Sequence, residues 1–197
     1  MTTRLLLLTP ARTASLRRAV FDDGDPLDEG GAARARAAAG RLVRPEAVVG
    51  SGSVRCAQTA RLLGLGDLRA VPELAGLDAG RWRGRAVDEV GAAEPEALGR
   101  WLADPEAAAP GGESVADVCA RVGRWLRALA DEDAGRVTAV VEPDVVRAAA
   151  VHATGAPLSA FWRLDVEPLT VTELSGRAGR WNLRVGRPLA AVTAEER

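Results

Sequence analysis

Apolar and polar positions along the chain follow two periods, one typical of strands and one typical of helices. Apolar runs at residues 5–8, 47–49 and 137–141, the last interrupted only by Thr138, predict short strands buried on both faces. Residues 170–174 and 181–185 alternate between apolar and polar side chains around a glycine-containing turn, which predicts a hairpin. Helical spacing or a high alanine content predicts helices near residues 31–43, 53–63, 94–103, 114–130 and 145–153.

Polar residues at the ends of these segments predict where two of the helices begin. Ser51 or Ser53 can accept a hydrogen bond from the first turn of the helix after residues 47–49. Ser114, with Asp117 three residues later, predicts a capped start for the longest helix. Because strands alternate with helices, the expected fold class is α/β, a three-layer α/β/α sandwich with a mostly parallel sheet.

The length of 197 residues is enough for one domain with a substantial core, and it requires no second domain. Residues 1–188 are expected to form that domain. Within it, a stretch of about 72–113, which begins with a segment punctuated by glycine and proline, is expected to be an irregular and helical insertion over the pocket. Residues 189–197 are predicted to be a polar tail.

Composition argues against several classes of function. The formal net charge is -1, whereas a nucleic-acid-binding domain needs a net basic face. The chain contains arginine but no lysine, a bias that we attribute to a GC-rich bacterial genome rather than to a binding patch. Cys56 and Cys119 lack the spacing and the companion histidines of a zinc site, so they are expected to be small buried side chains. We predict no metal, no cofactor and no nucleic-acid partner.

The leucine run at residues 5–8 is much shorter than the apolar core of a signal peptide. No stretch approaches the roughly 18 apolar residues that a membrane-spanning helix needs. The expectation is a cytoplasmic protein that does not bind membranes.

Four motifs occur in the order in which a known family has them. They are Pro26-Leu27-Asp28 with Gly31, Arg55 with Gln58-Thr59-Ala60, Gly80-Arg81-Trp82 with Gly84, and the PGGES of residues 110–114 followed by Arg121. Together they resemble the histidine phosphatase superfamily, in its phosphoglycerate-mutase-like branch 1. The resemblance implies a reaction in which an imidazole attacks phosphorus, cationic groups hold the phosphoryl oxygens, and a carboxylic acid protonates the leaving group.

The sequence departs from the family where this chemistry is expected. The family's first strand ends in Arg-His-Gly, and Thr9 and Pro10 stand in the places of the arginine and the histidine. Glu142 stands where the second histidine is expected, and Gly76 stands where the acidic proton donor is expected. Of the five pocket residues, only Arg55 matches the family pattern. Both catalytic histidines are therefore missing from the matched positions.

These replacements favour a catalytically inactive histidine-phosphatase-like protein, a pseudophosphatase with a binding or scaffold role. Proline has no nucleophilic side chain, and a glutamate beside Arg55 cancels the positive charge that would hold a phosphate. The expected partner is a small molecule or a protein that the sequence does not identify. Arg12 is a candidate to replace the lost arginine, so Arg55, Glu142 and Arg12 are the predicted ligand-binding residues.

Two other functions stay open at this point. In the first, Glu142, with Asp144 or Asp78, performs acid–base catalysis on a neutral or cationic small molecule, because burial can tune a carboxylate towards neutral pH. The competing interpretation of Glu142 is a salt bridge to Arg55. In the second, residual phosphatase activity uses His152, the only histidine of the chain, for which a packed or surface position on a helix is the competing interpretation.

Two further groups of residues are expected to be structural. The aspartates at 22, 23 and 25 lack the ligand spacing of a calcium loop, so a solvated turn is expected there. The five tryptophans are expected to anchor the core or an interface, and Trp162 is a candidate for the interface of a homodimer.

Overall fold

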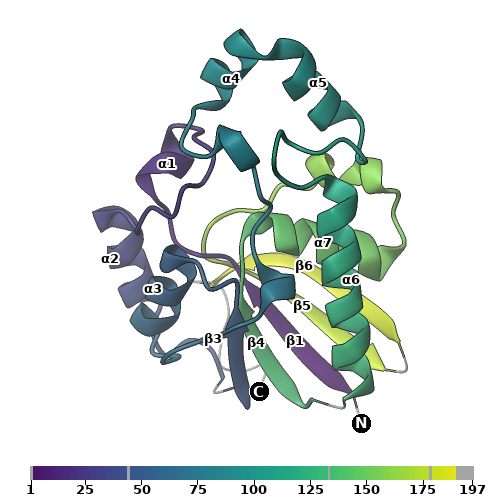
Figure 1. The fold of residues 1–197 in the computed structure, drawn as a ribbon. Coiled ribbons are helices and arrows are strands. Elements are labelled where there is room, and N and C mark those ends of the chain that lie inside the picture. The colour runs from purple at the N-terminus through teal and green to yellow at the C-terminus, as the bar shows by residue number, and fades with distance from the viewer. Residues whose placement is uncertain (1, 44, 133, 178, 190–197) are drawn as a thin grey trace.

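The computed structural model describes residues 2–43, 45–132, 134–177 and 179–189. A six-stranded sheet in the order β3-β2-β4-β1-β5-β6 forms its centre (Figure 1). Strands β3, β2, β4 and β1 run parallel, whereas β5 and β6 form an antiparallel hairpin beside β1. The strand bounds are β1 Thr3–Leu8, β2 Ala47–Gly50, β3 Arg69–Ala70, β4 Arg136–Val140, β5 Thr170–Arg177 and β6 Arg180–Pro188.

Helices cover both faces of the sheet, so the expected three-layer α/β arrangement with a mostly parallel sheet is confirmed. Helices α6 and α7 pack on one face, and α2 and α3 pack on the other (Figure 1). The α-helices are α1 Ala14–Arg17, α2 Glu29–Ala37, α3 Val54–Leu62, α4 Val87–Ala93, α5 Pro95–Ala103, α6 Val115–Asp131 and α7 Pro143–Thr154. Three 3₁₀ helices complete the order: η1 Pro72–Leu74, η2 Gly80–Trp82 and η3 Leu158–Arg163.

The predicted helix starts are correct at both serines. Ser53 caps α3 by accepting a hydrogen bond from the backbone N–H of Cys56, and Ser114 and Asp117 form a reciprocal capping box on α6. The helix expected at residues 31–43 is wrong at its end, because α2 stops at Ala37 and Gly40 has a positive φ that a right-handed helix does not contain. Four elements of the structure, α1, α4, β3 and η3, were not predicted from the sequence.

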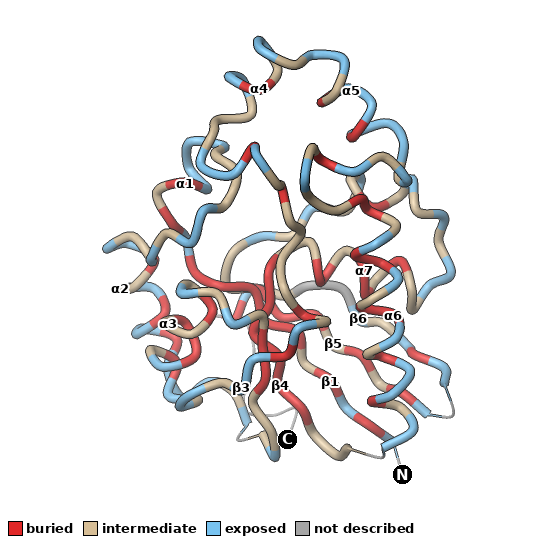
Figure 2. Tube along the Cα trace, viewed as in Figure 1, coloured by how far each residue is buried: buried red, intermediate tan, exposed pale blue. Residues whose placement is uncertain are grey.

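Burial is concentrated in the sheet and in the helix faces that touch it (Figure 2). The largest cluster of buried side chains joins β1, β4 and β5 to α6 and α7, and it includes Leu5, Leu126 and Phe161. A second cluster, which includes Cys56, lies between the other face of the sheet and α3. Leu189, at the start of the predicted polar tail, is buried in this second cluster, and residues 190–197 lie outside the described residues.

A separate lobe, which we call the upper lobe, consists of η2, α4 and α5 and stands at the top of Figure 1. It has a small core of its own, in which Trp82 and Trp101 pack edge to face with ring centroids 5.6 Å apart. Trp101 also packs against Trp162, which follows α7, at 4.7 Å. Among the described residues, no helix is both long enough and apolar enough to cross a membrane.

Candidate functional site

Parallel pairing brings three loops together at one edge of the sheet. Strands β2, β4 and β1 are neighbours and run in the same direction, so the residues that follow them meet at their carboxyl ends. Pro10 follows β1, Ser53 follows β2 and Glu142 follows β4. This edge is where ligands bind in parallel α/β folds, so the sequence-predicted positions lie in the expected place.

Glu142 directs its side chain into this edge rather than towards its own helix. It occupies the N-cap position of α7 with an extended backbone, and Pro143 opens the helix, but the carboxylate makes no capping hydrogen bond. The side chain is only 2% exposed. A buried carboxylate needs strong partners, because removing its charge from water is costly.

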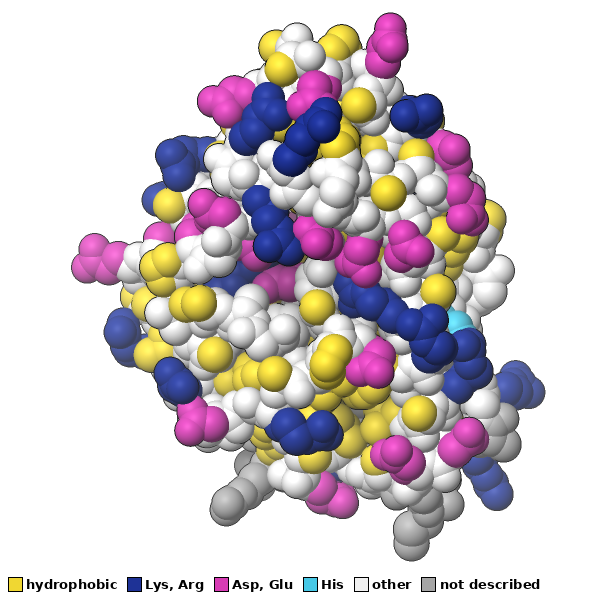
Figure 3. Space-filling view, viewed as in Figure 1, with side chains coloured by type: hydrophobic (Ala, Val, Ile, Leu, Met, Phe, Trp, Pro, Cys, Tyr) yellow, Lys and Arg dark blue, Asp and Glu magenta, His cyan; other side chains and the backbone are white. Residues whose placement is uncertain are grey.

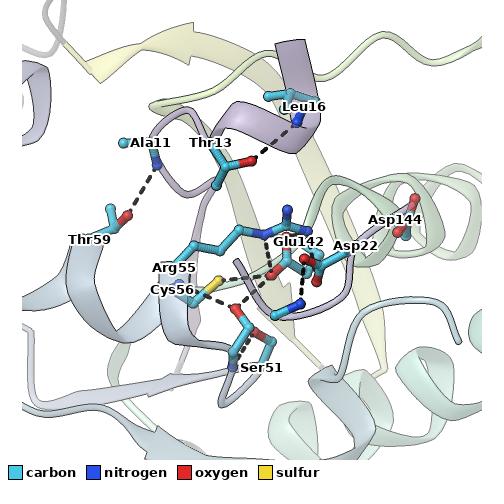
Figure 4. Close-up of polar contacts among 12 residues, drawn as sticks. Ala11, Thr13, Leu16, Asp22, Ser51, Arg55, Cys56, Thr59, Glu142 and Asp144 are labelled. Carbon is cyan, nitrogen blue, oxygen red and sulfur yellow. Dashed lines mark hydrogen bonds and ion pairs between the residues drawn. The ribbon is translucent and has the colours of Figure 1, made fainter. Parts of the chain in front are cut away.

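Arg55 of α3 is the main partner of this carboxylate (Figure 4). Its Nε donates to Glu142 Oε1 at 3.0 Å and to Oε2 at 2.8 Å, and its Nη2 lies 2.7 Å from Oε2. The hydroxyl of Ser53 donates to Oε1 at 2.7 Å, and the thiol of Cys56 lies 3.5 Å from the same oxygen. Both carboxylate oxygens are therefore engaged by cationic or polar donors of α3 and its cap.

A second carboxylate approaches the same arginine from the loop after α1. Asp22 Oδ2 lies 3.2 Å from Arg55 Nη2, and both side chains appear together in Figure 4. Burial raises the pKa of Asp22, and the charge of Arg55 only partly offsets this effect. Burial alone would lower the pKa of Arg55, but the charge and hydrogen bonds of Glu142 more than reverse this and raise it. Arg55 therefore stays charged between two acidic groups.

Burial and the nearby Glu142 carboxylate together raise the pKa of the Cys56 thiol, so it stays protonated. A protonated, fully buried thiol is a poor nucleophile. Cys56 thus fits the small buried side chain that the sequence predicts.

Gly76 lies directly against Glu142. A Cβ atom added to Gly76 would come within 2.9 Å of Glu142 Cγ, which is closer than two such carbons approach. Arg121 of α6 holds this loop in place, since its guanidinium donates to the carbonyl oxygens of Glu73, Ala75 and Gly76 at 2.7–3.1 Å. The absent side chain at position 76 leaves the room that the Glu142 side chain fills.

Thr9 and Pro10 face a different part of the chain. Thr9 is buried, and its hydroxyl donates to the carbonyl oxygen of Glu167 at 2.6 Å and accepts from the N–H of Thr170 at 3.0 Å. The carbonyl oxygen of Pro10 accepts from the N–H of Leu169 at 3.3 Å. Both residues thus attach the loop of residues 167–170 to the end of β1, and neither supplies a group to Arg55.

The structure does not bring the other candidates to the Arg55–Glu142 pair. Arg12 is exposed and lines a separate cavity. Asp144 is paired with Arg147, and Asp78 accepts hydrogen bonds from Arg83 and from the N–H of Gly80. His152 lies in the last turn of α7 and packs against Gly123 of α6.

Carboxylate oxygens of Asp22, Asp23 and Asp25 lie within 4.8 Å of one another, but only Asp22 reaches the site. Asp25 accepts a hydrogen bond from the N–H of Ser15. No local sequence pattern predicts that Asp22 approaches Arg55, because the contact joins the loop after α1 to helix α3, far apart in the chain. Ser53 was expected only as a helix cap, and it also binds the Glu142 carboxylate.

Acidic and basic side chains lie side by side in a hollow between the upper lobe and the sheet (Figure 3). A model of the histidine phosphatase superfamily (branch 1) matches residues 13–186. The chain belongs to this superfamily. The match begins after Thr9 and Pro10, so these two residues lie outside it.

Solved structures of the superfamily extend this likeness to the whole fold. A mycobacterial glucosyl-3-phosphoglycerate phosphatase has 26% identity and a TM-score of 0.81, with 94% of this chain and 98% of that chain covered. YhfR from Bacillus stearothermophilus has 25% identity and a TM-score of 0.80, with 93% and 96% covered.

A longer protein of Mycobacterium tuberculosis, named Bifunctional protein Rv2228c, is similar in sequence. It is 40% identical over 131 residues, which is 62% of this chain. The matched segment makes up only 36% of that protein. The chain therefore corresponds to about a third of this relative.

Proposed function

We propose that this member of the histidine phosphatase superfamily is a pseudophosphatase that acts as a binding or scaffold protein for a small molecule or a protein. The observation that carries the proposal is the buried carboxylate of Glu142, held by two nitrogens of Arg55. Arg55 matches the family's phosphate-binding arginine, and here an acidic side chain of the protein itself occupies it.

Charge supports this proposal. Arg55 contributes one positive charge, and Glu142 and Asp22 in contact with it are both acidic groups. At an effective dielectric constant of about 20, a like-charge contact at about 4 Å costs on the order of 4 kcal/mol. A phosphate that entered this site would meet that repulsion and would also have to displace the Glu142 carboxylate from Arg55.

The reacting groups implied by the family also have no counterpart at the matched positions. Pro10 has no lone pair or titratable proton with which to attack phosphorus. Gly76 has no acid to protonate a leaving group, and the Glu142 side chain fills the adjoining space. His152 packs against Gly123 of α6 from the far end of α7, away from the strand end that holds Glu142.

Acid–base catalysis by Glu142 stays a prediction that a single substitution tests. Its oxygens already accept from Arg55 and Ser53, which leaves little capacity to take a proton from a substrate. Glu142→Gln keeps the shape and removes the charge. A catalytic role requires that this variant lose turnover of a neutral or cationic substrate while it still binds that substrate.

The proposal is tested by phosphatase assays with p-nitrophenyl phosphate and 3-phosphoglycerate. We expect the native protein to hydrolyse neither compound faster than an Arg55→Ala variant. Hydrolysis well above that variant would contradict the proposal.

A reverted protein, with Thr9→Arg, Pro10→His, Gly76→Glu and Glu142→His together, is the positive control. Because a Cβ at position 76 would lie too close to Glu142 Cγ, Gly76→Glu is made together with Glu142→His. Activity in the reverted protein and none in the native protein would assign the loss to these four positions.

We further propose that residues 1–188 form one domain. Pairing of β1 with β5 in a single sheet supports this, because it joins the two ends of the chain. The cytoplasmic location and the homodimer stay predictions of the sequence.

A further inference from the structure

A cavity of about 380 Å³ lies between α2 and the loop that follows η3. Arg12, Arg34 and Arg41 contribute its basic lining, and Glu167 is its acidic residue. Its apolar lining includes Leu169 and Leu189. None of these residues contacts the Arg55–Glu142 pair, and the volume is within the range of small-molecule sites.

The replaced residues at the end of β1 shape the wall of this cavity. The Thr9 hydroxyl binds the carbonyl oxygen of Glu167, and the Pro10 carbonyl oxygen binds the N–H of Leu169. Leu169 has a φ of 54°, a left-handed conformation that is uncommon for a residue with a side chain. Its carbonyl oxygen accepts from the N–H of Leu189 at 2.9 Å, so hydrogen bonds on both sides fix this strained residue.

Two of the cavity's basic side chains, Arg12 and Arg34, have no partner among the described residues. In the described part of the chain, the guanidinium groups of Arg12 and Arg34 make no ion pair or hydrogen bond, and the carboxylate of Glu167 makes none either. The backbone of Arg12 is nevertheless fixed, because its carbonyl oxygen accepts from the N–H of Asp28 at the start of α2. Arg12 and Arg34 therefore line one cavity on backbone that is held by α2, and neither guanidinium forms an ion pair with a described residue.

We propose that this cavity binds a small organic anion with one oxyanion group, a carboxylate or a phosphate, on an apolar body. Arg12 and Arg34 would hold the oxyanion, since guanidinium groups form paired charge-assisted hydrogen bonds to both kinds of group. Leu169, Pro168 and Pro188 would contact the apolar body, since they line the cavity and are not fully buried. Glu167 repels further negative charge, so ligands with a single anionic group fit best.

Four probes separate the contributions to binding: octanoate, octyl phosphate, octylamine and inorganic phosphate. Titration is followed by backbone amide NMR on the full chain at low ionic strength. We expect octanoate and octyl phosphate to shift the amides of Arg12, Ala38 and Leu169, and octylamine and inorganic phosphate to bind at least about tenfold more weakly. The ratio of the first two affinities distinguishes a carboxylate ligand from a phosphate ligand.

Matched variants decide whether the arginines carry this binding. Arg12→Ala and Arg34→Ala should each weaken octanoate binding by about tenfold, and added salt should weaken it in the native protein. Arg124→Ala, which removes an exposed arginine of α6, should leave the affinity unchanged.

Three results would overturn the proposal. Octylamine could bind as tightly as octanoate, or both arginine variants could bind octanoate normally. Binding that is lost in Arg55→Ala and retained in Arg12→Ala would place the anion at the Arg55 site instead.

Discussion

Glu142 and Arg55 form a buried ion pair in which each side chain supplies the opposite charge and the hydrogen-bond partner of the other. A buried carboxylate without a partner would be strongly destabilising, and Arg55 provides two hydrogen bonds and a full charge. The arginine in turn has an anionic partner without any bound ligand. The charge of Arg55 is thus balanced by the protein itself, whereas the arginine of a phosphate-binding site is balanced by the bound phosphate.

Glu142→Gln should destabilise the protein by about 3 to 5 kcal/mol, because it leaves a largely buried arginine without its main counter-charge. Chemical denaturation at neutral pH measures the change in the free energy of unfolding. Asp67→Asn is the matched control, since Asp67 pairs with Arg61 of the same helix but the two side chains are 82% and 65% exposed. We expect that control to cost less than about 1 kcal/mol. Equal losses in the two variants would contradict the assigned importance of burial.

Gly76→Ala tests the contact between the loop and Glu142. The new methyl group would come too close to Glu142 Cγ, so we expect a loss of about 1 to 3 kcal/mol in stability. Gly99→Ala, in α5 where an added Cβ meets nothing within 4 Å, should instead stabilise by about 0.5 to 1 kcal/mol. In a Glu142→Ala background the cost of Gly76→Ala should largely vanish, and an unchanged cost would show that the contact is not its cause.

Some of the contacts around Glu142 can be predicted from the sequence, and others cannot. The pairing of Glu142 with Arg55 follows from two motifs that the sequence places at neighbouring strand ends. The contact with Gly76 does not, because it depends on how Arg121 draws the loop against the sheet. The proximity of Asp22 is likewise a tertiary contact with no local signal.

At the scale of elements, α6 and α7 pack together partly through the imidazole of His152 on α7, which fills the space beside Gly123 on α6. His152 Nδ1 would lie 3.0 Å from a Cβ on Gly123, so the glycine makes room for the ring. Burial lowers the pKa of His152, and the charge of Arg127 lowers it further. The folded protein therefore prefers the neutral imidazole.

This preference gives a pH dependence with a defined sign. Folding lowers the pKa of His152 below the usual 6.5. The contribution of the neutral imidazole to the free energy of unfolding is therefore complete above pH 6.5, and it is lost as the pH falls through the lower pKa of the folded state. His152 is the only histidine, so proton NMR can follow its single imidazole, and we expect a midpoint below 6.5. His152→Gln should remove this part of the pH dependence, whereas a native midpoint at or above 6.5 would contradict the account.

Helices with clear periodicity or serine caps were predictable, and short helices were not. The bounds of α6 follow from an amphipathic pattern and a capping box, and both are made by residues of the helix and its N-cap. Helix α4 has only seven residues, and it is stabilised by packing of its buried Val90 in the tryptophan-containing core of the upper lobe. The helix predicted at residues 31–43 extended too far because alanine favours helix at every position, while the chain turns at Gly40.

At the scale of the whole molecule, the upper lobe and the sheet form two cores that share few side chains. Leu77 and Trp162 pack against both cores. Trp101 is the centre of the lobe, since its ring contacts Phe21, Trp82 and Trp162 with centroids 4.7–5.9 Å away. Removing the Trp101 ring should therefore lower the local stability of the upper lobe more than that of the sheet.

Trp101→Leu is expected to cost the lobe about 3 kcal/mol of local stability, because the smaller side chain leaves a cavity and loses the ring contacts. Amide hydrogen exchange should accelerate in α4 and α5 and change much less in β1 and β4. Trp125→Leu, in the half-buried part of α6, is the matched control and should affect the sheet side instead. Equal acceleration in both regions for Trp101→Leu would show that the lobe and the sheet open as one cooperative unit.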